Sequence, residues 1–155
     1  MIASVAAAAV NANMGGRDHG ANYMERAVVD WTRARMGLPE GASGILVTGT
    51  SQATVIAFQA ARLRVLSGLR KTGQGGVRLT AYAGEGVHNA TLKAVELLGI
   101  GSDNLRKVPL AGGQIDCAAL AAMVAQDKAA GAVPFLVVGT AGSVDLGLYD
   151  DLNAL

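Results

Sequence analysis

Short apolar runs alternate with helical patterns along most of this chain, and that alternation limits its fold more than any other feature. Apolar runs at 44–49, 77–82, 105–110 and 134–139 are predicted to be buried strands. Between them, apolar residues recur at helical spacing, which predicts helices at 51–67, 88–98 and 116–130. Strands and helices in this order are typical of an α/β fold, with a mostly parallel sheet and flanking helices.

The two ends of the chain carry further helical signals. Apolar residues from Met24 to Trp31 recur at helical spacing and predict an amphipathic helix at 23–36, ended by Gly37 and Pro39. The apolar stretch 1–10 is expected to be the last turns of a helix, since it is too short to span a bilayer and lacks the positive start of a signal peptide. A helix is also expected to begin near Asp150, so the sequence reads as a truncated piece.

Charge and composition exclude several classes of protein. The chain has 13 basic and 12 acidic residues, so it offers no basic face for nucleic acid and no polybasic patch for a membrane. Aromatic residues make up 4%, which leaves few platforms on which bases could stack. The single cysteine, Cys117, cannot form an internal disulfide, and this favours a cytoplasmic location.

One candidate ligand site is the segment 48–54, where a predicted strand leads into a predicted helix. In α/β folds, ligands bind at the carboxyl ends of the strands. Free backbone N–H groups at the helix start, beside the hydroxyls of Thr50 and Ser51, form a cradle for phosphate. The alternative is that Ser51 only caps a structural helix. No Gly-Lys-Ser/Thr follows, so the segment is not a P-loop.

Two more segments follow predicted strands. His88, in 84–89, is interpreted either as a ring that stacks on a flat cofactor or as a solvated cap residue. Thr140, in 140–143, either offers its hydroxyl to a ligand or simply ends a strand. His19 and His88 do not have metal-ligand spacing, so no metal site is predicted. The acidic residues near the end of the chain, Asp145, Asp150 and Asp151, are interpreted as turn and N-cap residues.

Several blocks, taken in order and spacing, resemble the group II pyridoxal-phosphate-dependent decarboxylases, which act on aromatic amino acids, histidine, glutamate and related substrates. The blocks are 25–31, 49–54 with 60–62, 87–89, 93–100, 127–135 and 138–150. The resemblance runs from about Asn11 to Leu155. It implies that residues 1–155 are the incomplete N-terminal part of the cofactor-binding large domain, in the aspartate-aminotransferase-like fold type I.

The resemblance also implies roles for individual residues. Thr50 and Ser51 would bind the phosphate of pyridoxal 5′-phosphate, His88 would stack on its pyridine ring, and Thr140 would lie near the ring hydroxyl. His19 would lie on the substrate side, although 18–23 departs from the Ser-Pro-Ala-like stretch usual in the family. The Schiff-base lysine and the aspartate that pairs with the pyridine nitrogen are expected beyond Leu155.

The activity implied by the resemblance is decarboxylation of an amino acid by a homodimeric lyase. The lysines of this chain, Lys71, Lys93, Lys107 and Lys128, are interpreted as solvated surface residues. We therefore expect no catalysis from this chain alone, and we expect it to aggregate or to depend on a partner, because a cut sheet exposes an edge. Two alternatives stay open: a non-catalytic binding fragment, and an unrelated nucleotide-binding α/β domain that uses the same helix start at Ser51.

Overall fold

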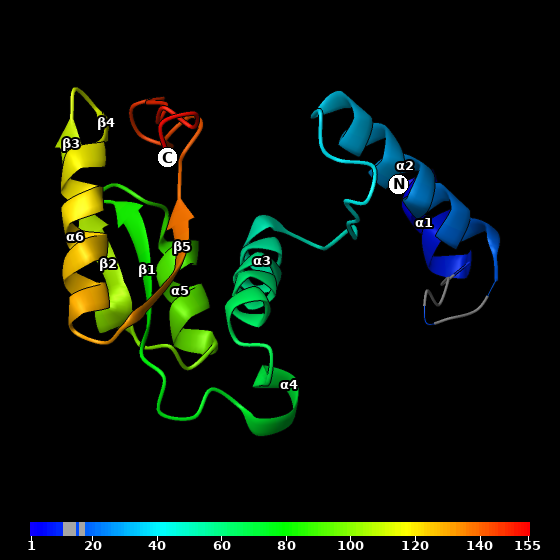
Figure 1. Ribbon diagram of the computed structural model, residues 1–155. Coiled ribbons are helices and arrows are strands. Elements are labelled where there is room, and N and C mark those ends of the chain that lie inside the picture. Colours follow the sequence, from blue (N-terminus) through cyan, green and yellow to red (C-terminus); the bar gives the residue numbers. More distant parts are fainter. Residues whose placement is uncertain (11–14, 16–17) are drawn as a thin grey trace. The chain divides into compact units, whose positions relative to one another are not determined.

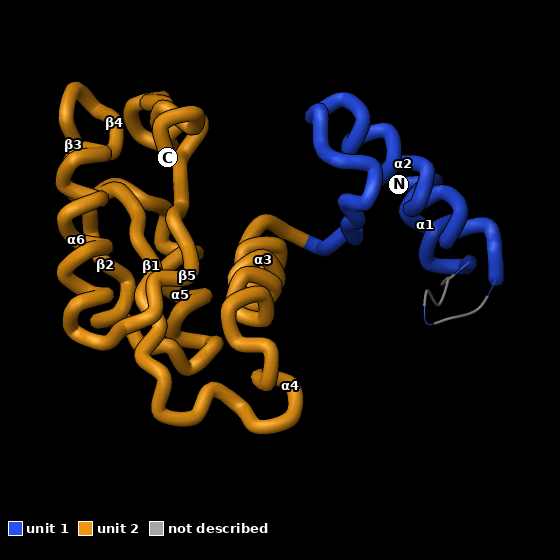
Figure 2. The backbone as a smooth tube through the Cα atoms, viewed as in Figure 1, with its two compact units in different colours: residues 1–48 blue, residues 49–155 orange. Residues whose placement is uncertain are grey.

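The chain forms two compact units, residues 1–48 and residues 49–155 (Figure 2). The computed structural model describes residues 1–10, 15 and 18–155, so the start of the resemblance at about Asn11 lies outside the described residues. Within these ranges, no helix combines the length and the apolar character that crossing a membrane requires.

The first unit contains two helices, α1 (Ile2–Val10) and α2 (Gly20–Arg35). Both were predicted, although α2 begins three residues before the expected start at 23. Gly37 ends α2 with a φ of 65°, a backbone conformation that favours glycine. Neither helix has a buried residue, and Trp31 is 62% exposed.

The predicted strand at 44–49 is wrong. These residues have no regular secondary structure, and Ile45 and Leu46 are 60% and 59% exposed. None of the described β-pairings includes a residue of this segment. Instead, the backbone N–H of Leu46 donates to Glu25 Oε1 of α2 at 2.8 Å. An apolar run indicates that a segment can be a strand, but it does not supply the neighbour.

The second unit is built on a parallel sheet with the order β2-β1-β5, which confirms the predicted fold class (Figure 1). A short antiparallel hairpin, β3-β4, follows β2. The elements of this unit are α3 (Thr50–Val65), α4 (Leu69–Thr72), β1 (Leu79–Gly84), α5 (Asn89–Leu97), the 3-10 helix η1 (Ser102–Asn104), β2 (Leu105–Val108), β3 (Leu110–Ala111), β4 (Gln114–Ile115), α6 (Cys117–Ala129) and β5 (Val133–Val138). From Asp151 the chain forms a turn instead of the helix expected near Asp150.

The central strand β1 is buried on both faces, as expected for a parallel sheet between helices. Its alternate residues Leu79, Ala81 and Ala83 belong to a core shared with α3 and α5. Tyr82 points to the opposite face and joins a second core with Leu120 of α6. The helices therefore cover the two faces of the sheet.

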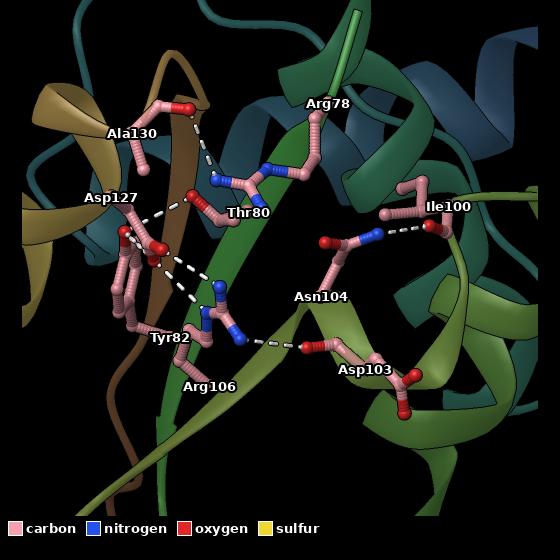
Figure 3. A network of polar contacts seen from close by, with 9 residues as sticks. All are labelled: Arg78, Thr80, Tyr82, Ile100, Asp103, Asn104, Arg106, Asp127 and Ala130. Carbon is pink, nitrogen blue, oxygen red and sulfur yellow. Dashed lines mark hydrogen bonds and ion pairs between the residues drawn. The ribbon is translucent and has the colours of Figure 1, made fainter.

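A polar network lies within the α6 face of the sheet (Figure 3). The Tyr82 hydroxyl donates to Asp127 Oδ2 at 2.7 Å, and the guanidinium of Arg106 donates to both carboxylate oxygens of Asp127, at 3.0 and 2.7 Å. Asp127 is only 6% exposed, and its hydrogen bonds with Arg106 hold its pKa below the ordinary range. Burial raises the pKa of Tyr82, whose hydroxyl also lies 3.0 Å from that of Thr80. The network joins β1, β2 and α6 through groups that are each satisfied by the others.

Candidate functional site

A cavity of about 630 Å³ lies at the carboxyl ends of β1 and β5. Its wall consists mainly of the segments that follow these two strands, within 84–91 and 138–150, together with Leu110 and Gly113 from the β3-β4 hairpin. A volume of this size is in the range of small-molecule sites. Its position at the strand ends is where ligands bind in open α/β sheets. His88 and Thr140, which follow different strands, both line it.

His88 is the N-cap residue of α5. Its Nδ1 accepts a hydrogen bond from the backbone N–H of Ala90 at 3.1 Å. An accepting Nδ1 carries no proton, so in the neutral ring the proton is on Nε2. The bond fixes the orientation of the imidazole, which is exposed at the cavity wall. The two interpretations of His88 are therefore compatible, because the capping edge and the stacking face of the ring are different surfaces.

Thr140 follows the last residues of β5 and is half-buried. Its backbone is held on both sides by Asp150: the Thr140 N–H donates to Asp150 Oδ2 at 2.7 Å, and the Asp150 N–H donates to the Thr140 carbonyl oxygen at 2.8 Å. Within the described residues, no hydrogen bond occupies the Thr140 hydroxyl. That hydroxyl is therefore open to a ligand.

Asp150 is the residue of this site that the sequence analysis missed. Its interpretation as a turn or N-cap residue is wrong, because its carboxylate accepts from Thr140 and, through Oδ1, from the Ile115 N–H at 2.8 Å. These partners lie 10 and 35 residues away in sequence. No local pattern could have indicated such a pairing.

Thr50 and Ser51 are the first residues of α3. The prediction that Ser51 caps this helix is wrong: the N-cap is Gly49, whose carbonyl accepts from the Ala53 N–H at 3.1 Å. Thr50 and Ser51 are the first and second residues of the helix after this N-cap, where backbone N–H groups have no intrahelical acceptor. In Figure 1, α3 starts at the end of the sheet to which the β1 and β5 arrows point. Both residues lie outside the wall of the cavity that His88 and Thr140 line.

The remaining predicted residues lie elsewhere. His19 is the N-cap residue of α2, in the first unit, and its carbonyl accepts from the Asn22 N–H at 3.1 Å. The lysines Lys71, Lys93, Lys107 and Lys128 are all exposed, and none lines the cavity. In the part of the chain that the structure describes, no three His, Cys, Asp or Glu side chains are grouped as a metal site requires.

Comparison with known proteins gives one consistent result. A family model described as "Pyridoxal-dependent decarboxylase conserved domain" matches residues 1–155. The aromatic-L-amino-acid decarboxylase of Sus scrofa is 32% identical over 145 residues, which cover 83% of this chain and 29% of the pig protein. The glutamate decarboxylase of Drosophila melanogaster is 30% identical over 135 residues, covering 85% of this chain and 26% of the fly protein.

The same likeness holds for solved structures. The crystal structure of the glutamate decarboxylase domain of diaminobutyrate-pyruvate transaminase and L-2,4-diaminobutyrate decarboxylase from Vibrio parahaemolyticus aligns with a TM-score of 0.88 and 31% identity. The alignment covers 98% of this chain and 35% of that chain. This chain thus spans about a third or less of the proteins that it matches.

Proposed function

This chain belongs to the family of pyridoxal-dependent decarboxylases, and from that premise we propose that residues 1–155 are the N-terminal part of the large domain of an amino-acid decarboxylase. Pyridoxal 5′-phosphate is the cofactor that family membership indicates. When bound, it supplies an electron sink for the loss of the substrate carboxyl group. The observation that supports this proposal best is the shared cavity of His88 and Thr140 at the strand ends.

The residues of the site fit such a cofactor. The cavity combines an exposed, oriented imidazole with an unoccupied hydroxyl, and these suit the face and the polar edge of a flat pyridine ring. The first turn of α3 offers N–H groups and two hydroxyls, which suit a phosphate. We propose that His88 stacks on the ring, that Thr140 binds at the ring hydroxyl, and that Thr50 and Ser51 bind the phosphate.

The binding test uses pyridoxine 5′-phosphate, which has the ring and the phosphate but no aldehyde. Because this probe cannot react with surface lysines, any affinity reports the non-covalent site alone. Equilibrium dialysis against the chain should show that pyridoxine 5′-phosphate binds more tightly than pyridoxine, and that ATP competes poorly. Equal affinity for pyridoxine 5′-phosphate and pyridoxine would refute the phosphate site. Strong competition by ATP would favour the nucleotide-binding alternative.

Two variants test the individual roles. His88→Asn keeps a good N-cap side chain but removes the ring, and should weaken binding by about threefold to tenfold. Ser51→Ala should weaken the binding of pyridoxine 5′-phosphate by a similar factor and leave the binding of pyridoxine unchanged. Ser67→Ala, an exposed position just beyond the other end of α3, is the matched control and should leave binding unchanged.

Catalysis and assembly are further parts of the proposal. We propose that the Schiff-base lysine and the aspartate for the pyridine nitrogen lie beyond Leu155, that His19 contributes to the substrate side, and that the whole enzyme is a cytoplasmic homodimer acting on an amino acid. The exposed apolar side chains of the first unit, among them Tyr23, Met24 and Trp31, support burial against another surface. This chain with pyridoxal 5′-phosphate should release carbon dioxide from aromatic amino acids or glutamate no faster than free cofactor does. Sedimentation velocity of the whole enzyme tests whether it is a dimer.

A further inference from the structure

We propose that Asp150 is the positioning residue for Thr140. Its carboxylate ties the end of β5 to the β3-β4 hairpin and so holds Thr140 at the wall of the cavity. The ligand that Thr140 meets comes from the proposed function, but the tie itself does not depend on it.

Three hydrogen bonds define the tie. Asp150 Oδ2 accepts from the Thr140 N–H at 2.7 Å, Asp150 Oδ1 accepts from the Ile115 N–H at 2.8 Å, and the Asp150 N–H donates to the Thr140 carbonyl at 2.8 Å. The first two have a charged acceptor, and their lengths are typical of such bonds. Each carboxylate oxygen thus already serves one backbone donor. In an asparagine, an NH2 group replaces one of these two oxygens and faces a backbone N–H group, so one of the two hydrogen bonds is lost.

Ile115 gives the tie a rigid support. It is 5% exposed and belongs to the core beneath α6, with Tyr82 and Leu120. Thr140, by contrast, starts a loop of residues 140–150 that lies at the cavity. Asp150 therefore connects a surface loop to a well-packed part of the core.

The loop has other bonds that would keep it closed without the carboxylate. Ala141 and Tyr149 form an antiparallel bridge, and the Tyr149 carbonyl accepts from Gln114 Nε2 at 2.8 Å. The Leu148 carbonyl accepts from two further loop N–H groups, those of Gly142 and Ser143. Loss of the Asp150 carboxylate should therefore displace Thr140 without unfolding the loop.

The first test needs no ligand. In the full chain, Asp150→Asn should speed amide hydrogen exchange by about tenfold or more at Thr140 or Ile115, whichever N–H group faces the new NH2 group, as loss of a hydrogen bond to a charged group predicts. It should also shift the methyl resonance of Thr140. Asp151→Asn is the matched control, because among the described residues the Asp151 carboxylate accepts only from the local N–H groups of Asn153 and Ala154. Unchanged exchange at both Thr140 and Ile115 in Asp150→Asn would overturn the proposal.

The second test asks whether Asp150 acts through Thr140. In a double-mutant cycle on the dissociation constant of pyridoxine 5′-phosphate, Asp150→Asn should weaken binding by about tenfold in the wild-type background and have almost no effect in Thr140→Val. An effect of equal size in both backgrounds would overturn the positioning role, since a general structural effect is additive. If the wild-type chain does not bind the probe, the proposed function fails, and the exchange and methyl measurements decide the Asp150 tie by themselves.

Discussion

The ion pair between Arg106 and Asp127 allows a quantitative prediction of stability. Arg106→Met would leave the Asp127 carboxylate without its ion-pair partner, in a side chain that is 9% exposed. Breaking a buried pair from one side costs roughly 3–5 kcal/mol, because the remaining charge stays buried. The Arg106 side chain is itself 31% exposed, so water reaches the site and the lower end of that range applies. We therefore expect the free energy of unfolding to fall by about 3 kcal/mol.

The matched double variant separates a pairing effect from a packing effect. Arg106→Met with Asp127→Leu removes both charges and leaves Tyr82 with its partner Thr80 at 3.0 Å. Replacing a buried ion pair by apolar side chains is often nearly neutral, so the double variant should lose about 1 kcal/mol or less.

Urea unfolding of the chain, followed by circular dichroism, measures these differences. Arg70→Met is the control, because Arg70 is exposed and has no ion pair among the described residues. Two results would refute the reasoning. One is a loss of unfolding free energy in Arg106→Met no larger than that in Arg70→Met. The other is a loss in the double variant equal to the sum of the losses in Arg106→Met alone and Asp127→Leu alone.

Three further predictions follow from the second unit. The pKa of Asp127 is lowered in the fold. Its contribution to stability should therefore be complete above the pKa of an unfolded aspartate, about 3.9, and be lost as the pH falls through the pKa in the folded state. Measuring the stability of wild type and of Asp127→Asn as the pH is lowered checks this. Asp116→Ala removes the N-cap of α6 and should cost about 1 kcal/mol in urea unfolding. Gly112 and Gly113 both have positive φ, but of the two only Gly113 would bring an added Cβ against a side chain, 3.0 Å from Leu148. Thermal unfolding should therefore show Gly113→Ala to be less stable than Gly112→Ala by about 1 kcal/mol.

Local sequence patterns predicted most of the elements of the second unit. The strands expected at 77–82 and 134–139 appear as β1 (Leu79–Gly84) and β5 (Val133–Val138), and the helix expected at 116–130 appears as α6 (Cys117–Ala129). These predictions succeed because periodicity, caps and glycine stops act over a few residues. For the same reason the sequence already indicated that His88 and Thr140 follow strands, and hence lie at one end of a parallel sheet.

The sequence by itself determined the α/β class and the order of elements, because the spacing of apolar residues within each segment indicates whether it is a buried strand or a helix. Only the tertiary structure decided which groups meet. The apolar run 44–49 takes part in no described β-pairing, and Asp150 binds Thr140 and Ile115 in place of capping a helix. Asp127 likewise meets Tyr82 across 45 positions. Such pairings depend on the path of the whole chain through space, which brings distant donors and acceptors within about 3 Å of each other.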